Sequence, residues 1–357
     1  MKQRLLSIDI LRGLTIVLMI VVNSPGTWNH IASPLRHSAW NGLTLADVIF
    51  PCFMFIMGIT TYISLRKYNF AFSPQLFRKI LRRTVVLYML GLLVNWAAAG
   101  LPGLAELRLV GVLHRFAICY FVVSLLATVA SPRRLACIAA LLLVGYGVLL
   151  LACNGYAYDE SNLLSVVDRA CLGSHMMYDG GIDPEGILST IPSIAHVMIG
   201  FCMGAVALAQ RKLTDNIVAL TQWSIILLFV GLLADSIVPM NKKLWSPSFV
   251  AATCGLSALA LVLLAILLDV KKANLPKKIF LIFGTNPLVC YVLGELLYAA
   301  LYSISINNVP LLDYLYGTCA ALLGDNALAS FASALAVTAV VGIVGWALYA
   351  KKIFVKI

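Results

Sequence analysis

The sequence predicts an all-α, polytopic membrane protein of about ten transmembrane helices, with the N-terminus and the C-terminus both in the cytoplasm. Of its 357 residues, 61% are hydrophobic and only 11% are charged, and the mean hydropathy is +0.95. Soluble domains usually carry roughly 25% charged residues. A hydrocarbon core about 30 Å thick needs roughly 20 apolar residues per helix. We therefore expect a single transmembrane domain, residues 1–357.

Apolar stretches of membrane length define the expected spans in chain order. They cover residues 8–24, 43–65, 79–99, 112–130, 134–153, 187–209, 216–236, 247–269, 279–301 and 328–350. The first could pass for a signal peptide, but Asp9 and Arg12 interrupt it and no small-residue cleavage site follows, so we interpret it as a span. Residues 311–323 are expected to be interfacial or re-entrant, because a crossing there would move Lys351 and Lys352 outside.

The distribution of basic residues predicts the orientation. The net charge of +11 does not indicate a nucleic-acid partner, because the lysines and arginines form small clusters between apolar runs. With a cytoplasmic N-terminus most of them lie inside, as the positive-inside rule requires. The outer side keeps only Arg36, Arg108, Arg115, Arg169, Lys242 and Lys243. We expect a multi-pass protein of a bacterial inner membrane.

The longest connection, residues 154–186, is predicted to lie outside the membrane. It is acidic, with Asp159, Glu160, Asp168, Asp179, Asp183 and Glu185 against a single Arg169. The nine cysteines include no CxxC pair, so no metal site is predicted. Cys153 and Cys171 flank or lie in this loop and could pair, which their spacing alone does not decide.

Ionisable and polar groups within spans need a partner or a function, because burying them in the bilayer is costly. Asp9 and Arg12 are three residues apart on one helix face. They could form a structural ion pair or lie near a phosphate-bearing ligand. Glu295 lies inside the span 279–301, and Asn286 before Pro287 indicates an interrupted helix. Either Glu295 or Asn286 could line a polar cavity.

The polar segment 36–47 leads directly into a span and contains the first candidate reactive group. A neutral imidazole at His37 can accept a proton near pH 7, and Asp47 can orient it if folding brings the two together. The alternative is a solvated loop histidine. Trp40 and Asn41 belong to the same segment.

Two groups of cations are further candidates. Arg82 and Arg83 lie at the cytoplasmic end of the span 79–99, where the positive-inside rule explains most of the charge. Arginine also matches phosphate geometry, which a topology signal does not require. Lys242 and Lys243 lie on the outer side, where that rule disfavours lysine. They indicate a bound anion or an acidic partner.

A series of blocks resembles the heparan-alpha-glucosaminide N-acetyltransferase family and its bacterial relatives. The opening run 7–13, followed by Met19 and Asn23, is similar to the family's first block. The later blocks are residues 37–47 with Phe50, Pro51 and 53–58, then 111–115, 183–190, 241–248 and 284–286. They occur in order over nearly the whole chain. His114 departs from the pattern, since the family usually has glutamine there.

The resemblance implies transfer of an acetyl group from cytoplasmic acetyl-CoA to the amine of a terminal glucosamine across the membrane. The family's histidine, aspartate and asparagine correspond to His37, Asp47 and Asn23. On this basis we expect His37 to act as base or acetyl carrier, Asp47 to orient it, and Asn23 to donate to the oxyanion. The resemblance also implies a homodimer.

Each remaining candidate is expected to contact either the donor, acetyl-CoA, or the amino-sugar acceptor, and no metal is expected. The phosphates of acetyl-CoA are expected to meet the cytoplasmic cations Arg12, Arg82, Arg83 and Lys352. The amino-sugar acceptor is expected to meet Trp40, Asn41, Arg115, Asn241, Lys242, Asn286 and Glu295. The alternative function is an amino-sugar transporter that uses intramembrane His, Asp and Glu side chains. Transporters often contain internal repeats, and the absence of one in this sequence makes that function the second choice.

Overall fold

The structure is all-α, which confirms the predicted fold class. The computed structural model describes residues 5–101, 103, 106–177, 181–210, 212–274 and 276–355. Its α-helices are α1 (Leu6–Asn23), α2 (Leu45–Arg66), α3 (Pro74–Ala98), α4 (Val112–Leu126), α5 (Pro132–Ala152), α6 (Leu163–Leu172), α7 (Thr190–Ala207), α8 (Leu213–Ala234), α9 (Pro247–Leu264), α10 (Lys277–Thr285), α11 (Pro287–Ser303), α12 (Leu311–Leu323) and α13 (Ala327–Ala350). A 3-10 turn, η1 (Ser33–Leu35), follows α1, and a π-helical turn, η3 (Ala265–Val270), extends α9. The strands β1 (Ser305–Ile306) and β2 (Val309–Pro310) form an antiparallel hairpin.

The length and apolar composition of the helices are those of a polytopic membrane protein. Within the described ranges, eight helices are long and apolar enough to cross a bilayer, namely α1, α2, α3, α5, α7, α8, α9 with η3, and α13. The pair α10 and α11 passes the same test together and adds a ninth candidate. The span expected at 112–130 is the 15-residue helix α4, which is shorter than a full crossing needs. The 13-residue α12 occupies the stretch expected to be interfacial or re-entrant.

The interruption expected before Pro287 is present, and α11 is bent from α10 by 85°. Proline has no backbone N–H and disfavours a helical conformation in the preceding residue, so Asn286 ends α10 outside the helical region. The Asn286 side chain is buried. It donates to the Ile353 carbonyl at 2.9 Å and accepts from the Val355 N–H at 2.8 Å. This amide therefore ties the end of the chain to the helix break.

The helices pack closely around α1 and α2. Helix α1 contacts α2, α9, α10, α11 and α13, and α2 also packs along α7. At the α2–α7 contact a Cβ atom on Gly58 would lie 2.4 Å from the Val197 carbonyl oxygen. One on Gly200 would lie 2.4 Å from the Phe55 carbonyl oxygen. Glycine permits this approach of two backbones, as small residues commonly do between membrane helices.

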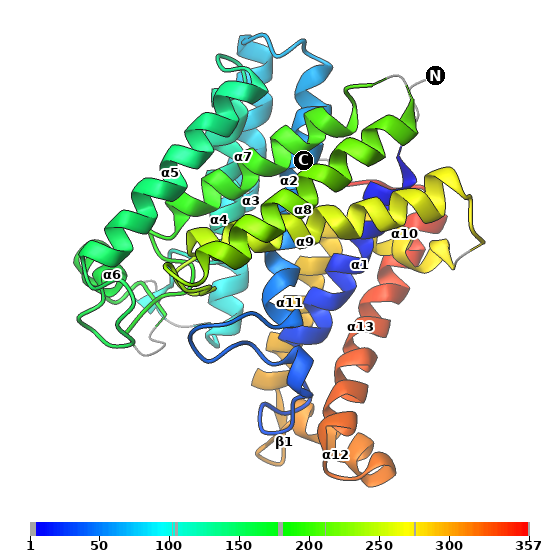
Figure 1. Cartoon of the computed structure of the whole chain (residues 1–357). Helices are drawn as coiled ribbons and strands as arrows, with labels where there is room; N and C mark the ends of the chain where they lie inside the picture. The colour runs from blue at the N-terminus through cyan, green and yellow to red at the C-terminus, as the bar shows by residue number, and fades with distance from the viewer. Residues whose placement is uncertain are drawn as a thin grey trace.

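Long loops meet at one end of the bundle. Figure 1 shows the β1–β2 hairpin and α12 at the lower end, near the loop that joins α1 to α2, while α1 begins and α13 ends toward the opposite end. The α1–α2 loop is joined to the α8–α9 loop by a hydrogen bond from Gly42 N–H to the Met240 carbonyl at 2.8 Å. Segments far apart in sequence thus come together at this end.

The predicted outer loop 154–186 is partly ordered by helix α6. Asp168 and Asp183 are buried rather than solvated, and Asp179 lies outside the described residues. Cys153 and Cys171 are both free and exposed, so the pairing that their spacing left open is not formed.

Candidate active site

His37 and Asp47 are in direct contact at the start of α2. Nδ1 of His37 lies 2.8 Å from Oδ1 of Asp47. Asp47 is the third residue of α2, and with Thr44 it forms a capping box. Its second oxygen, Oδ2, accepts from the Thr44 N–H at 3.1 Å, the Thr44 hydroxyl at 2.9 Å and the Ser38 N–H at 3.1 Å. The helix start therefore holds this fully buried carboxylate in one orientation and directs Oδ1 at the imidazole.

The contact with Asp47 determines the chemistry available to His37. Asp47 accepts from Nδ1–H, so the neutral ring carries its lone pair on Nε2. The imidazole is 39% exposed and lines a cavity, whereas its carboxylate partner is inaccessible. Nε2 can therefore accept a proton from a group in the cavity, and Asp47 stabilises the imidazolium that results.

Lys242, from the α8–α9 loop, joins this pair. Its Nζ lies 3.1 Å from Nδ1 and 3.3 Å from Nε2 of His37, and 3.7 Å from Oδ1 of Asp47. Burial lowers the pKa of Lys242, while the neighbouring Asp47 carboxylate opposes that shift. The sequence predicted a bound anion or an acidic partner for Lys242 and Lys243. For Lys242, Asp47 is such a partner.

The loop that carries Lys242 is held by buried polar and aromatic groups. The fully buried Asn241 accepts from the Leu244 N–H at 3.0 Å and donates to the Asn41 side chain at 3.1 Å. Trp245 adopts a positive φ of 54° and packs against Phe50 of α2, with ring centroids 5.0 Å apart. These contacts press the loop onto the first turns of α2, where Asp47 lies.

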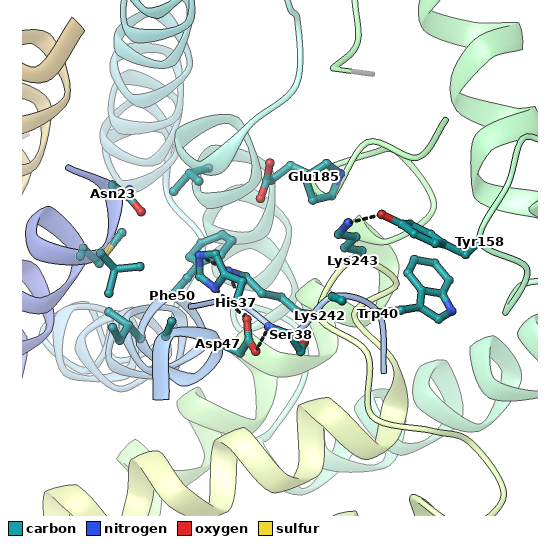
Figure 2. A pocket seen from close by; sticks show the side chains of 17 residues that line it. Asn23, His37, Ser38, Trp40, Asp47, Phe50, Tyr158, Glu185, Lys242 and Lys243 are labelled. Carbon is teal, nitrogen blue, oxygen red and sulfur yellow. Dashed lines mark hydrogen bonds and ion pairs between the residues drawn. The ribbon is translucent and has the colours of Figure 1, made fainter. Parts of the chain in front are cut away.

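An aromatic pair forms another wall of the same cavity. The rings of Trp40 and Tyr158 are 4.6 Å apart, and the Trp40 indole N–H donates to the Tyr156 carbonyl at 3.1 Å. Nζ of Lys243 donates to the Tyr158 hydroxyl at 3.2 Å. Figure 2 shows Trp40, Tyr158 and Lys243 together on one side of the pocket, with Asn23 on the other.

Two adjoining cavities extend through this part of the bundle. The first, of about 430 Å³, is lined by the residues above, together with Asn23 and Glu185. The second, of about 530 Å³, is lined by Arg12 and Arg83 and by apolar side chains of α1, α2 and α4. Met19 of α1 lines both. The His37 cavity and the arginine-lined cavity therefore adjoin along α1.

The predicted site residues divide into those at the cavities and those away from them. Asn23 lines the first cavity and donates to Oε1 of Glu295 at 2.8 Å. Arg12 donates to the Gly284 carbonyl at 2.8 Å and to Asp9 at 2.8 Å, so the expected ion pair is formed at the second cavity. Arg83 stacks over the Tyr120 ring at 4.4 Å.

Other candidates lie elsewhere. Arg82 and Lys352 are exposed and are absent from the linings of both cavities as far as the chain is described. Arg115 is fully buried over the Trp245 ring and donates to the Ser189 hydroxyl. Asn286 holds the C-terminal segment, and Asn41 and Asn241 join two loops.

Sequence reasoning did not single out Tyr158, or Glu185 as an individual site residue, although both line the first cavity. Both lie in the loop 154–186, where the sequence indicates only acidic character. Among the described residues, no group of three or more His, Cys, Asp or Glu side chains is arranged to hold a metal ion.

The fold and this site define a multi-pass membrane protein with a histidine–aspartate pair at a cavity where its loops meet the start of α2. A family model described as heparan-alpha-glucosaminide N-acetyltransferase, catalytic, matches residues 4–234, which is more than half of the chain. The chain belongs to this family, which confirms the resemblance found in its sequence blocks.

Two relatives carry that enzyme's name. Heparan-alpha-glucosaminide N-acetyltransferase from Homo sapiens is 28% identical over 337 residues, covering 76% of this chain and 50% of the human protein. The Mus musculus protein is 27% identical over 361 residues, covering 83% of this chain and 54% of the mouse protein. The chain thus spans about half the length of the curated relatives it matches.

Proposed function

We propose that the protein is a transmembrane N-acetyltransferase that moves acetyl from cytoplasmic acetyl-CoA to the amine of a glucosamine-type sugar at the outer side. The supporting observation is that a cavity containing His37 and Asp47 adjoins, at Met19, a second cavity lined by Arg12 and Arg83. Both volumes are within the range of small-molecule sites, about 300–1,000 Å³. A long cosubstrate could occupy one cavity and present its thioester in the other.

The second cavity has the chemistry that the donor needs. The guanidinium groups of Arg12 and Arg83 suit phosphate oxygens, and apolar side chains suit the uncharged arm. The two hydrogen bonds of Arg12 orient it without a cosubstrate. Arg82 and Lys352 are exposed. We therefore propose that they attract the anionic donor electrostatically and do not contact it inside the cavity.

In the proposed reaction the amine nitrogen attacks the thioester carbonyl carbon, a C–N bond forms and the C–S bond breaks. Nε2 of His37 takes a proton from the amine and passes it to the departing thiolate, so the products are the amide and the free thiol. Asp47 stabilises the imidazolium between these two transfers. Asn23 and the Lys242 ammonium supply donors for the developing oxyanion.

A covalent route differs only in the first acceptor of the acetyl group. In that route Nε2 attacks the thioester, and acetyl-His37 then passes the acetyl group to the amine. Incubation with labelled acetyl-CoA and no acceptor separates the two routes. Label on His37 supports the acetyl carrier, and its absence supports direct transfer.

The proposal extends to the cellular setting. We assign residues 1–357 to one transmembrane acyltransferase domain in a bacterial inner membrane, with both ends cytoplasmic, as the distribution of lysine and arginine predicts. The homodimer is proposed from the family resemblance. Native mass spectrometry of the detergent-solubilised protein tests the dimer.

The decisive experiment supplies the purified protein with acetyl-CoA and a panel of amino sugars and identifies the products by mass spectrometry. We expect N-acetylated product from the wild type and none from His37→Ala. The control is His30→Ala, since His30 lies in the same loop and contacts Asp325 rather than Asp47. Full turnover by His37→Ala would contradict the assignment. Uptake of labelled glucosamine into vesicles without acetylation would support the transporter instead.

A further inference from the structure

We propose that Glu185, held by Arg108, is the carboxylate that recognises the ammonium group of the acceptor and so makes the site specific for amines. This inference rests on the proposed function and adds to it the group that selects the substrate class. Figure 2 shows the Glu185 carboxylate across the cavity from Asp47, between Asn23 and Lys243.

The position of this carboxylate is determined by surrounding contacts. The Glu185 side chain is only 10% exposed, and its Oε2 accepts from a terminal nitrogen of Arg108 at 2.8 Å. Asp183, which is fully buried, binds the same guanidinium through both of its oxygens. The Glu185 N–H also donates to Asp183 at 2.9 Å. These bonds hold the Glu185 backbone and one of its oxygens, and leave the other oxygen for a ligand.

Glu185 shares the cation nearest to it with a second carboxylate. Asp183 and Glu185 share the single cation of Arg108, and Asp183 takes both Nε and a terminal nitrogen of it. Arg115 and Lys242 also act on Glu185 electrostatically, but Arg115 donates to the Ser189 hydroxyl and Lys242 lies nearest to His37 and Asp47. A largely buried negative charge is costly unless a cation accompanies it. The ammonium of an amino sugar would add a cation from inside the cavity, where Glu185 forms part of the lining.

The remaining walls complement the rest of such a ligand. The Trp40–Tyr158 pair offers an aromatic surface for the C–H face of a sugar ring. His37 lines the same cavity and carries the proposed base, Nε2. A sugar that lies against the aromatic pair with its nitrogen at Glu185 would share the cavity with that base, and the bound ammonium releases one proton to solvent before the neutral amine attacks.

The cavity also explains why the selecting carboxylate is Glu185 and not Asp47. Asp47 is fully buried, and its oxygens are occupied by His37, Thr44, Ser38 and the nearby Lys242. On Glu185, by contrast, Oε1 has no hydrogen-bond partner among the described residues. Of the two carboxylates that line this cavity, only Glu185 has an oxygen that a ligand can approach.

The test compares Glu185→Gln with the wild type in steady-state kinetics. Glutamine keeps an oxygen for Arg108 but removes the charge. We expect KM for glucosamine to rise on the order of 10- to 100-fold, as for loss of a hydrogen bond to a charged group, with unchanged affinity for acetyl-CoA. The control is Glu160→Gln, since Glu160 also pairs with an arginine, Arg169 at 2.7 Å, but is 67% exposed. An unchanged KM in Glu185→Gln would overturn the inference.

A second measurement needs no variant and covers the case in which Glu185→Gln does not fold. Calorimetric titration of the wild type with glucosamine and with glucose compares ligands that differ in the amine. We expect glucosamine to bind at least about 10-fold more tightly. Equal affinities would overturn the role of Glu185. Failure of the proposed function would look different, because no amino sugar would then be acetylated even if glucosamine bound selectively.

Discussion

The Nζ atom of Lys242 lies 3.1 Å from Nδ1 and 3.3 Å from Nε2 of His37, although the two residues are separated by 205 positions in the sequence. An ammonium so close to the proposed base can stabilise negative charge that develops on a carbonyl oxygen attacked there. The same contact brings two loops together, since His37 follows α1 and Lys242 follows α8. We therefore propose that Lys242 takes part in the reaction, in addition to the acceptor contact for which it was predicted.

Replacement of Lys242 by methionine should lower kcat on the order of 100-fold, the usual effect of removing one oxyanion donor, and should leave acetyl-CoA affinity unchanged. Lys243→Met is the matched comparison, because Lys243 lies next in the chain but contacts Tyr158. Its effect should fall mainly on KM for the acceptor. Equal loss of kcat in the two variants would contradict a special role for Lys242.

The charge of Lys242 also predicts a pH dependence. Burial lowers the pKa of this ammonium below the ordinary 10.5, so activity that requires it should be lost as pH rises through the lowered value. Arginine keeps its charge to much higher pH. Lys242→Arg should therefore move the alkaline limit of kcat upward by at least one pH unit, whatever its maximal rate. If the pH–rate profiles of the wild type and Lys242→Arg coincide at high pH, the alkaline limit belongs to a group other than Lys242.

Asp168 should make stability fall as pH rises between about 4 and 6. Burial raises the pKa of this carboxyl from 3.8 to about 6, although the Ile187 N–H donates to it at 2.8 Å. The folded state thus binds the proton more tightly than the unfolded chain, and the stabilisation present below pH 4 is lost above pH 6. Asp168→Asn should raise the unfolding temperature at pH 7.5 by about 2–4 °C and have less effect at pH 4. A lower unfolding temperature at pH 7.5 would show that the ionised form stabilises the fold.

The Asn286 side chain should influence the donor cavity through the C-terminal segment. Phe354 and Val355 line the second cavity, and Asn286 holds that segment with its two hydrogen bonds. Asn286→Ala should raise KM for acetyl-CoA about 10-fold, because loss of these bonds lets one cavity wall move. Asn216→Ala provides the control, since Asn216 makes two similar bonds to the Gln210 backbone away from both cavities. An equal change of KM in both variants would point to general destabilisation.

Local sequence signals predicted several features correctly. The Asn286–Pro287 pair predicted an interrupted helix because proline removes a donor and restricts its neighbour, and the break is present. Asp9 and Arg12, three residues apart, form the ion pair expected from helical spacing. The span expected at 112–130 came from apolar composition, which does not mark where a helix ends, and α4 ends at Leu126.

Local sequence signals did not predict which distant residues come into contact across the bundle. Arg82 and Arg83 are neighbours with the same chemistry, yet Arg83 lines the second cavity and Arg82 is exposed. The difference depends on which side of α3 each occupies relative to α4 and α11, which pack against it. In the sequence, Glu185 is one of several acidic residues in a predicted outer loop. In the structure it is largely buried, and Arg108 binds both Glu185 and Asp183.

The sequence alone determined the membrane class, the approximate spans, the predicted orientation and the family, because bilayer burial and motif order act through composition and local spacing. The tertiary structure decided which of the polar residues share a cavity. The contact of His37 with Lys242 joins the α1–α2 and α8–α9 loops, and that of Glu185 with Arg108 joins the α6–α7 and α3–α4 loops. Such contacts arise from long-range packing, which no local pattern of residues encodes.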